Sequence, residues 1–198
     1  MWKRIVVAGV VGGVAMFVWA SVAHMALPLG EAGIREVPNE QGLLAAMQTS
    51  IGPASGLYMF PGMGLGPEAT RQQRQAAMQG YPEKLARNPS GLLVYSPPGA
   101  SGMTPGRLGA EFLGEVIEAM LAAFLLTLTR LKGYAAKVGF VTVAGLMATI
   151  TTNLSYWNWY GFPATYTVAH MVTLLVGYLC AGLAMAAVVR NAAPKTAA

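Results

Sequence analysis

The sequence contains no aspartate, only one cysteine and few charged residues of any kind. Asp, Glu, Lys and Arg make up 11% of the 198 residues, against about 25% in ordinary soluble domains. Cys180 has no second cysteine with which to form an intramolecular disulfide, so cysteine usage does not indicate a redox compartment. Low charge together with 55% hydrophobic residues excludes an ordinary soluble domain and indicates an integral membrane protein.

Motifs of the common catalytic classes are also missing. Residues 28–104 carry no phosphate-binding loop, zinc-ligand spacing or nucleophile elbow, and GMGLGP (62–67) lacks the lysine of a phosphate cradle. The net charge of +5 does not indicate a nucleic-acid partner, because the basic residues stand at the ends of apolar runs instead of forming one cluster. These absences favour a protein that is not an enzyme and whose first partner is the lipid bilayer.

Four apolar runs are long enough to cross a bilayer, for which about 20 residues are needed. They extend from Ile5 to Leu27, from Pro105 to Arg130, from about Val138 to Tyr156 and from about Ala164 to Val189. Thr104 is a plausible N-cap for the second run, with Pro105 at its first helical position. The first run could instead be a secretory signal ending at Ser21–Ala23, but it exceeds the usual 7–15 apolar residues of such signals, so we expect an uncleaved anchor.

The basic residues predict the direction of these spans. With an even number of spans, seven of them flank helix ends on one side of the membrane. The positive-inside rule makes that side cytoplasmic. These residues are Lys3, Arg4, Arg130, Lys132, Lys137, Arg190 and Lys195. Both termini are then cytoplasmic. The aromatic turn SYWNWYGFP lies at the outer interface, where we expect a belt of Trp157, Trp159, Tyr160 and Phe162.

The long segment between the first two spans predicts a small folded insertion. PASGLYMFPG (53–62) and NPSGLLVYSPPG (88–99) are short apolar runs bounded by Pro and Gly, which is typical of two strands of one small sheet. Asn39 is a possible N-cap for a short helix, and residues 67–87 favour a helix as far as Pro82. The fold class is therefore an all-α membrane protein, a four-transmembrane-helix bundle with a small α+β extracytoplasmic insertion. Its expected boundaries are 1–28, 29–104 and 105–198.

Three of the eight acidic residues fall inside the second span. On a helix, Glu111, Glu115 and Glu118 lie within an arc of about 60° and form one polar face. Counting 20 residues from the basic residue at each inner end puts Glu111, His24 and His170 at one level near the outer boundary. The same count places Glu115 and Glu118 about 6 and 10 Å deeper.

This common level supports several hypotheses, which the sequence leaves open. The first is a purely structural role, in which the positive end of the helix dipole stabilises the carboxylates and the histidines lie at the membrane interface. A sharper one is a transition-metal site made of His24, Glu111, Glu115, Glu118 and His170, or a haem b with the two histidines as axial ligands. Another is a proton or cation path through Glu118, with Asn153 in the same intramembrane polar cluster.

Small residues at four-residue spacing predict close helix contacts, either within the bundle or with a partner. These pairs are Gly9 and Gly13, Ala144 and Ala148, and Gly177 and Ala181. They favour a non-catalytic accessory or scaffold subunit of a larger membrane complex or of a homo-oligomer. That role requires no cofactor, whereas the metal and haem hypotheses require one.

Two stretches also carry a resemblance. WASVAHMALPLGEAGI (19–34) and SYWNWYGFP (155–163) resemble segments of small bacterial four-helix inner-membrane proteins that carry no assigned activity. The resemblance implies a bacterial inner membrane and says nothing about mechanism.

Overall fold

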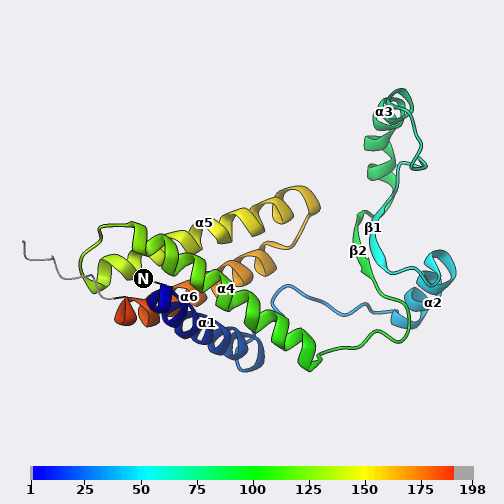
Figure 1. Ribbon diagram of the computed structural model, residues 1–198. Coiled ribbons are helices and arrows are strands. Elements are labelled where there is room, and N and C mark those ends of the chain that lie inside the picture. The colour runs from blue at the N-terminus through cyan, green and yellow to red at the C-terminus, as the bar shows by residue number, and fades with distance from the viewer. Residues whose placement is uncertain (1, 190–198) are drawn as a thin grey trace, which may run out of the picture. The chain divides into compact units, whose positions relative to one another are not determined.

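The computed structural model describes residues 2–189 and is mostly helical, with six helices and one two-stranded sheet in that range (Figure 1). It divides into two compact units. Residues 35–101 form an insertion, and the chain before and after them forms a helical bundle. The predicted C-terminal basic residues Arg190 and Lys195 lie outside the described residues.

Four long helices make the bundle: α1 (Trp2–Met25), α4 (Pro105–Leu128), α5 (Tyr134–Tyr160) and α6 (Ala164–Val188). Within residues 2–189, three of them, α1, α5 and α6, are long and apolar enough to cross a membrane. Helix α4 has the same length as α1, 24 residues, but carries three glutamates. Its predicted start is correct, because the Thr104 side chain accepts a hydrogen bond from the backbone N–H of Arg107.

Helix α1 occupies the middle of the bundle and packs antiparallel to both α4 and α6. A Cβ at Gly13 would lie 2.6 Å from Val116 Cα, and Phe17 meets Phe112 edge-on with ring centroids 5.4 Å apart. Towards α6, the indole N–H of Trp19 donates to the carbonyl of Thr173 over 2.8 Å. The small residues of α1 therefore let the neighbouring backbones approach closely.

Helices α5 and α6 form an antiparallel hairpin. The buried residues of α5 recur every fourth position and make one stripe along the helix: Lys137, Val141, Gly145, Thr149 and Asn153. The Lys137 ammonium donates to the Val189 carbonyl at one end of this hairpin, and Asn153 meets His170 near the other. Gly161 closes α5 in the left-handed conformation, with φ of 72°, which lets the chain reverse into α6.

The helices thus follow the spatial order α4, α1, α6, α5, and α4 and α5 touch only sparingly. These two helices diverge from the short loop that joins them (Figure 1). A closed four-helix bundle would bury both helices on two sides. Here one flank of α4 and one flank of α5 remain uncovered.

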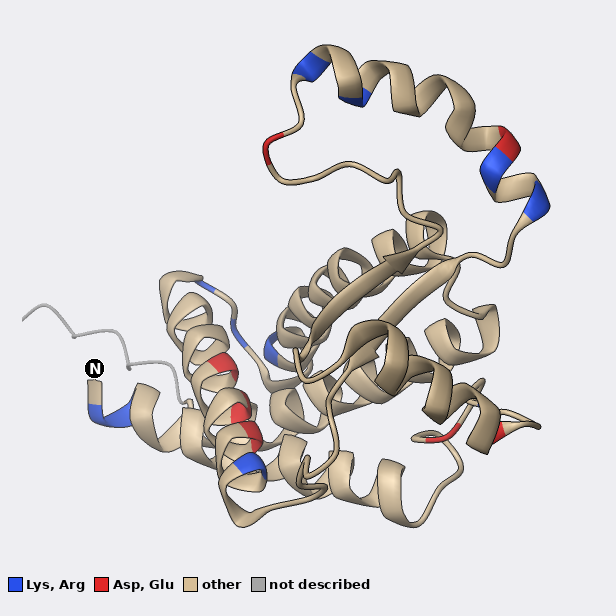
Figure 2. Cartoon of the chain, turned by 90° about the vertical axis from the view of Figure 1, so that its right-hand side faces the viewer, with Lys and Arg blue, Asp and Glu red and all other residues tan. Residues whose placement is uncertain are grey.

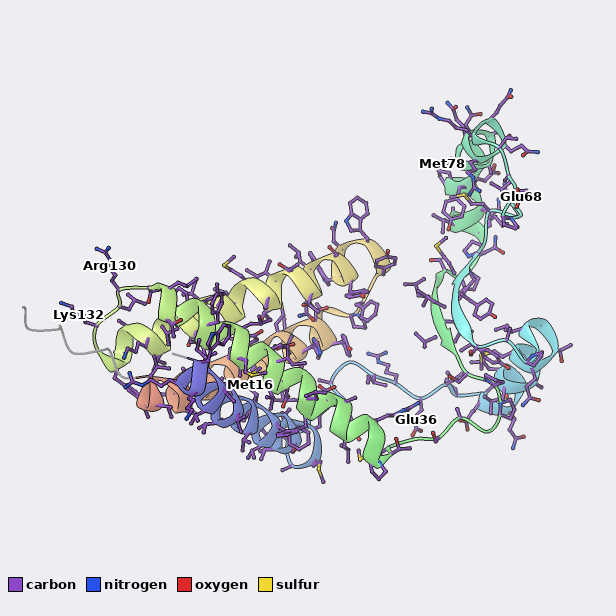
Figure 3. The ribbon with its side chains drawn as sticks, viewed as in Figure 1. Met16, Glu36, Glu68, Met78, Arg130 and Lys132 are labelled. Carbon is purple, nitrogen blue, oxygen red and sulfur yellow. The ribbon has the colours of Figure 1, made fainter. Side chains whose placement is uncertain are left out.

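Five of the six described Lys and Arg residues of the bundle gather at one end, which we call the basic end; the sixth, Arg107, lies in the first turn of α4. Trp2 stacks on Phe124 at 6.4 Å, so the start of α1 lies beside the last turns of α4. Arg130 and Lys132 occupy the loop after α4, at the same end (Figure 3). Lys3, Arg4 and Lys137 complete this set. The opposite end, which contains His24 and His170, is called the histidine end.

The insertion contains α2 (Glu40–Ile51), β1 (Gly56–Phe60), α3 (Arg71–Arg87) and β2 (Gly91–Tyr95). The predicted pair of strands is confirmed, and the structure shows that it is antiparallel, from Gly56 opposite Tyr95 to Phe60 opposite Gly91. The predicted N-cap of α2 is also confirmed, because the Asn39 side chain accepts from the backbone N–H of Gly42. Tyr95 is the one buried residue of the stretch 35–101, so the insertion has almost no core of its own.

The prediction that the polar helix stops at Pro82 is wrong. Helix α3 begins with a capping box between Thr70 and Gln73 and continues through Pro82 to Arg87. Proline deprives one carbonyl, that of Met78, of its helical partner. The side chain of Met78 is exposed, and water can satisfy its carbonyl at an exposed helix surface.

The boundary after the first span also differs from the predicted one at residue 29. Residues up to Ile34 belong to the bundle. A Cβ at Gly30 would lie 2.9 Å from the His24 ring, and a Cβ at Gly33 would lie 2.7 Å from the backbone nitrogen of Tyr166. The segment after α1 therefore folds over the histidine end, with glycines at its two closest approaches.

Candidate functional site

The three glutamates of α4 lie along one side of the helix (Figure 2). Glu115 is half-buried, whereas Glu111 and Glu118 are exposed. Their stripe borders the buried face of the helix, which contains Ala119 and Ala122. The remaining side of α4 is apolar and exposed, as lipid contact requires; it includes Leu113, Ile117, Leu121 and Leu128. We call the side with the glutamates the glutamate flank.

The glutamates lie deeper than the sequence predicted. Because Val116 contacts Gly13, Glu115 is level with about residue 14 of α1 and Glu111 with about residue 18. His24 is then about ten residues, or about 15 Å, beyond the level of Glu115. The predicted common level of glutamates and histidines is therefore wrong. The prediction of depth counted 20 residues back from Arg130. Arg130 lies beyond the end of α4, about five residues past the position of α4 that is level with Arg4, so the count placed the glutamates too close to the outer boundary.

The two histidines do share a level, as predicted. Trp19 bonds Thr173, His24 lies five residues after Trp19, and His170 lies three residues before Thr173. In antiparallel helices these offsets place the two imidazoles within about 3 Å of each other along the bundle axis.

The five residues predicted as one metal shell do not form one. Over residues 2–189, no group of three or more His, Cys, Asp or Glu side chains is arranged to hold a metal ion. Along the bundle axis, Glu111 lies about 9 Å and Glu115 about 15 Å from the level of His24, which accounts for this. Glutamates and histidines are therefore two different sites.

The predicted cluster of Glu118 with Asn153 is wrong for a similar reason. The Tyr178 hydroxyl donates to Glu118 Oε2 over 3.0 Å. The Tyr178 side chain lies against Gly145 of α5, where a Cβ would approach it to 2.3 Å. Asn153 stands eight residues further along α5, about 12 Å from Gly145. Glu118 thus belongs with Tyr178, and Asn153 with His170.

Tyr178 connects the two arms of the open bundle. It comes from α6, packs on α5 and bonds α4. Tyr178 was not among the residues predicted from the sequence, although a tyrosine in the middle of an apolar helix needs a partner for its hydroxyl, and this need distinguishes it from its neighbours.

One carboxylate oxygen of the flank is left unsatisfied. Glu115 Oε2 is buried and has no hydrogen-bond partner among the described residues. A buried polar atom without a partner destabilises a structure by about 1–3 kcal/mol. Glu111 and Glu118 are therefore the carboxylates of the flank that are accessible from outside the chain, whereas the unsatisfied Glu115 oxygen lies inside it.

The polar groups at the histidine end are fully engaged. Asn153 is 4% exposed; its Nδ2 donates to the Thr149 carbonyl over 2.8 Å, and its Oδ1 lies 2.7 Å from His170 Nδ1. Tyr166 stacks on the His170 ring with an interplanar angle of 6°. On α1, His24 Nδ1 lies 2.9 Å from the Ala20 carbonyl. Both imidazoles are thus oriented by hydrogen bonds through Nδ1.

The aromatic turn follows the histidine end. Trp157, Trp159 and Tyr160 are all exposed, with Trp159 reaching 79%. Phe162 contacts both Tyr156 and Tyr166, with ring centroids 5.2 and 5.4 Å apart. Such a set of exposed rings is typical of a membrane–water interface.

The small-residue contacts fall partly where they were predicted. Gly9 and Gly13 pack on α4. A Cβ added at Gly177 would lie 3.6 Å from the Trp19 ring, and Ala181 is buried. Ala144 and Ala148 are only half-buried. The stripe that packs on α6 lies one residue further, at Gly145 and Thr149, because rotation of α5 is set by Tyr178 and Asn153.

No protein family, curated protein or solved structure matches this chain.

Proposed function

We propose that the chain is a four-span protein of the bacterial inner membrane that acts as an accessory or scaffold subunit, with both termini cytoplasmic. Three spans follow from length and composition. The fourth, α4, is supported by its antiparallel packing along α1, from Phe124 beside Trp2 to Phe112 beside Phe17. A helix packed over that distance on a spanning helix shares its depth in the bilayer.

The orientation of these spans is supported by the basic end. Lys3, Arg4, Arg130, Lys132 and Lys137 all belong to it. By the positive-inside rule this end faces the cytoplasm, and the insertion faces the other side of the membrane.

Cysteine labelling tests this orientation. In a Cys180→Ser background, Met78→Cys on α3 and Lys132→Cys in the loop after α4 introduce exposed thiols at positions predicted on opposite sides. A membrane-impermeant maleimide is expected to label Met78→Cys in intact spheroplasts and Lys132→Cys only after permeabilisation. Labelling of Lys132→Cys in intact spheroplasts would contradict the orientation.

The subunit role rests on one observation, the uncovered glutamate flank at mid-depth. Glu118 is exposed and Glu115 has an unpartnered oxygen, both level with the middle of α1. A charged side chain at the bilayer centre costs about 2.5–3.5 kcal/mol on insertion scales. A transmembrane helix of another chain that presents hydrogen-bond donors or a cation would remove that cost. The occupant is another subunit or a second copy of this chain.

A conducting role for Glu118 has no comparable support and stays a prediction. The threonines between Glu118 and the basic end donate to carbonyls of their own helices: Thr127 to Phe124, Thr129 to Leu126 and Thr142 to Val138. Hydroxyls engaged in this way do not extend a polar path from the glutamate towards the basic end.

Crosslinking in native membranes tests the subunit role. Gly114 lies one turn before Glu118, and a Cβ there meets no atom within 4 Å, so a cysteine fits. In the Cys180→Ser background, Gly114→Cys is expected to crosslink to a second chain under mild oxidation or with a short thiol–amine reagent. Elution in mild detergent is expected at a mass well above one chain and its micelle.

Gly139 provides the matched control. It has equally open surroundings, but it lies on the face of α5 opposite the buried stripe, which we expect to face lipid. Gly139→Cys should therefore crosslink several-fold less. Equal crosslinking from both positions, or a monomer with no co-eluting chain, would rule out assembly through the glutamate flank.

A further inference from the structure

The basic end exposes four cations, and no described residue of the bundle carries a carboxylate there. The exposed cations are Lys3, Arg4, Arg130 and Lys132. The fifth basic residue, Lys137, is 6% exposed and donates to the Val189 carbonyl. On α4, Glu118 is the acidic residue nearest to this end, and it lies ten residues, or about 15 Å, before the end of the helix. Over the described residues of the bundle, the surface of this end is therefore positive.

The exposed cations lie beside one another at this end. Gly9 approaches Met120 of α4 and the two helices are antiparallel, so Lys3 is level with about residue 126 of α4. Lys3 is then about 3 Å from the end of α4 along the axis. Arg130 and Lys132 occupy the loop that follows, and their side chains extend away from the helices (Figure 3). The cations of α1 and of the loop therefore form one surface.

Two exposed aromatic residues mark this surface as a membrane interface. Trp2 directly precedes Lys3, and Tyr134 begins α5 three residues before Lys137. On α5, Trp157 of the aromatic turn comes 23 residues after Tyr134, which corresponds to about 35 Å. The hydrocarbon core of a bilayer is about 30 Å thick, and Trp and Tyr are enriched at both of its boundaries. On a spanning α5, the basic end therefore lies at the depth of the lipid phosphates.

We propose that the basic end binds anionic phospholipid headgroups through Lys3, Arg130 and Lys132, in preference to zwitterionic ones. Lys and Arg clustered next to a membrane span attract anionic lipids, and each charge changes the binding about fivefold. The partner is a lipid and not a soluble polyanion, because the interfacial rings hold these cations at the depth where lipid phosphates lie. The proposal rests on the proposed spans, but not on the side of the membrane that the basic end faces.

Native mass spectrometry of the full chain tests the lipid preference. The chain in mild detergent is mixed at low salt with equal amounts of phosphatidylglycerol and phosphatidylcholine that have the same acyl chains. We expect phosphatidylglycerol to bind at least tenfold more tightly, and this preference to fall as salt is added, because salt screens exposed charges. Equal retention of the two lipids, or a preference independent of salt, would overturn the proposal. Displacement of the lipid by inorganic phosphate at constant ionic strength would also overturn it, since that result indicates a site for free phosphate.

Paired neutralisations locate the bound lipid. Arg130→Gln combined with Lys132→Gln removes two exposed charges of the basic end, and we expect it to lower the affinity for phosphatidylglycerol at least tenfold. Arg35→Gln combined with Arg71→Gln is the matched control, because it removes the same charge from exposed positions of the insertion. Equal losses in the two pairs, or no loss in the first, would contradict binding at the basic end. These measurements use purified protein that elutes as a single species, so they do not depend on the orientation or on assembly through the glutamate flank.

Discussion

Replacing Gly13 by leucine is expected to force α1 and α4 apart. Even a single Cβ at this position would lie 2.6 Å from Val116 Cα and 2.8 Å from its backbone nitrogen. Backbone atoms do not move aside as the end of a flexible side chain does, so the helices themselves must separate. Overpacking of a tight core costs about 1–3 kcal/mol, and we expect this substitution to reach at least about 3 kcal/mol.

The measurement is the thermal unfolding of the purified chain in detergent, followed by the loss of monodisperse elution. Gly139→Leu is the control, because a Cβ there meets nothing within 4 Å. Leucine also favours a helix over glycine by up to about 1 kcal/mol, so the control should be neutral or slightly stabilising. If Gly13→Leu unfolds at the same temperature as the unchanged chain, the contact between α1 and α4 is not as described here.

Replacing Tyr178 by alanine is the second large change, because this residue joins three helices. Its ring fills the space against Gly145, and its hydroxyl bonds Glu118. Truncation of a large buried aromatic costs about 3–5 kcal/mol, and the half-buried position of Tyr178 points to the lower value, about 3 kcal/mol.

Tyr178→Phe separates the two contributions. It keeps the ring and removes only the bond to Glu118, and interhelical hydrogen bonds in membrane proteins contribute about 0.6 kcal/mol on average. We therefore expect a small loss from phenylalanine and a large one from alanine in the same thermal assay. If phenylalanine proves as damaging as alanine, the hydroxyl rather than the ring holds α5 and α6 to α4.

The glutamate flank and the histidine end lie at different levels of the same bundle. The glutamate flank lies at mid-depth and has an unpartnered acceptor in Glu115. The histidine end lies about 15 Å further along α1 and is covered by the segment that carries Gly30 and Gly33.

Local features of the fold could be predicted because they depend on neighbours in the chain. The caps at Asn39 and Thr104 and the two strands around Leu57 and Leu93 follow from capping chemistry and from Pro and Gly at the borders. Pro82 is the exception, since an exposed helix tolerates the carbonyl that proline leaves free.

The candidate site was predicted only in part, because its members come from different helices. The level shared by His24 and His170 was correct, because the bond of Trp19 to Thr173 sets the axial offset between α1 and α6. The level of Glu115 was wrong, since the contact of Gly13 with Val116 shifts α4 along α1. The stripe at Ala144 and Ala148 was displaced by one residue because the partners of α5 determine its rotation.

The sequence by itself therefore determined which segments are helical and that apolar runs dominate the chain, but not every helix end, since α3 continues through Pro82. Only the tertiary structure decided which polar groups meet: Glu118 with Tyr178, and Asn153 with His170. The physical reason is that hydrophobic periodicity specifies the length and faces of each helix. The axial shift and rotation between two helices arise from close contacts between side chains that are far apart in the sequence.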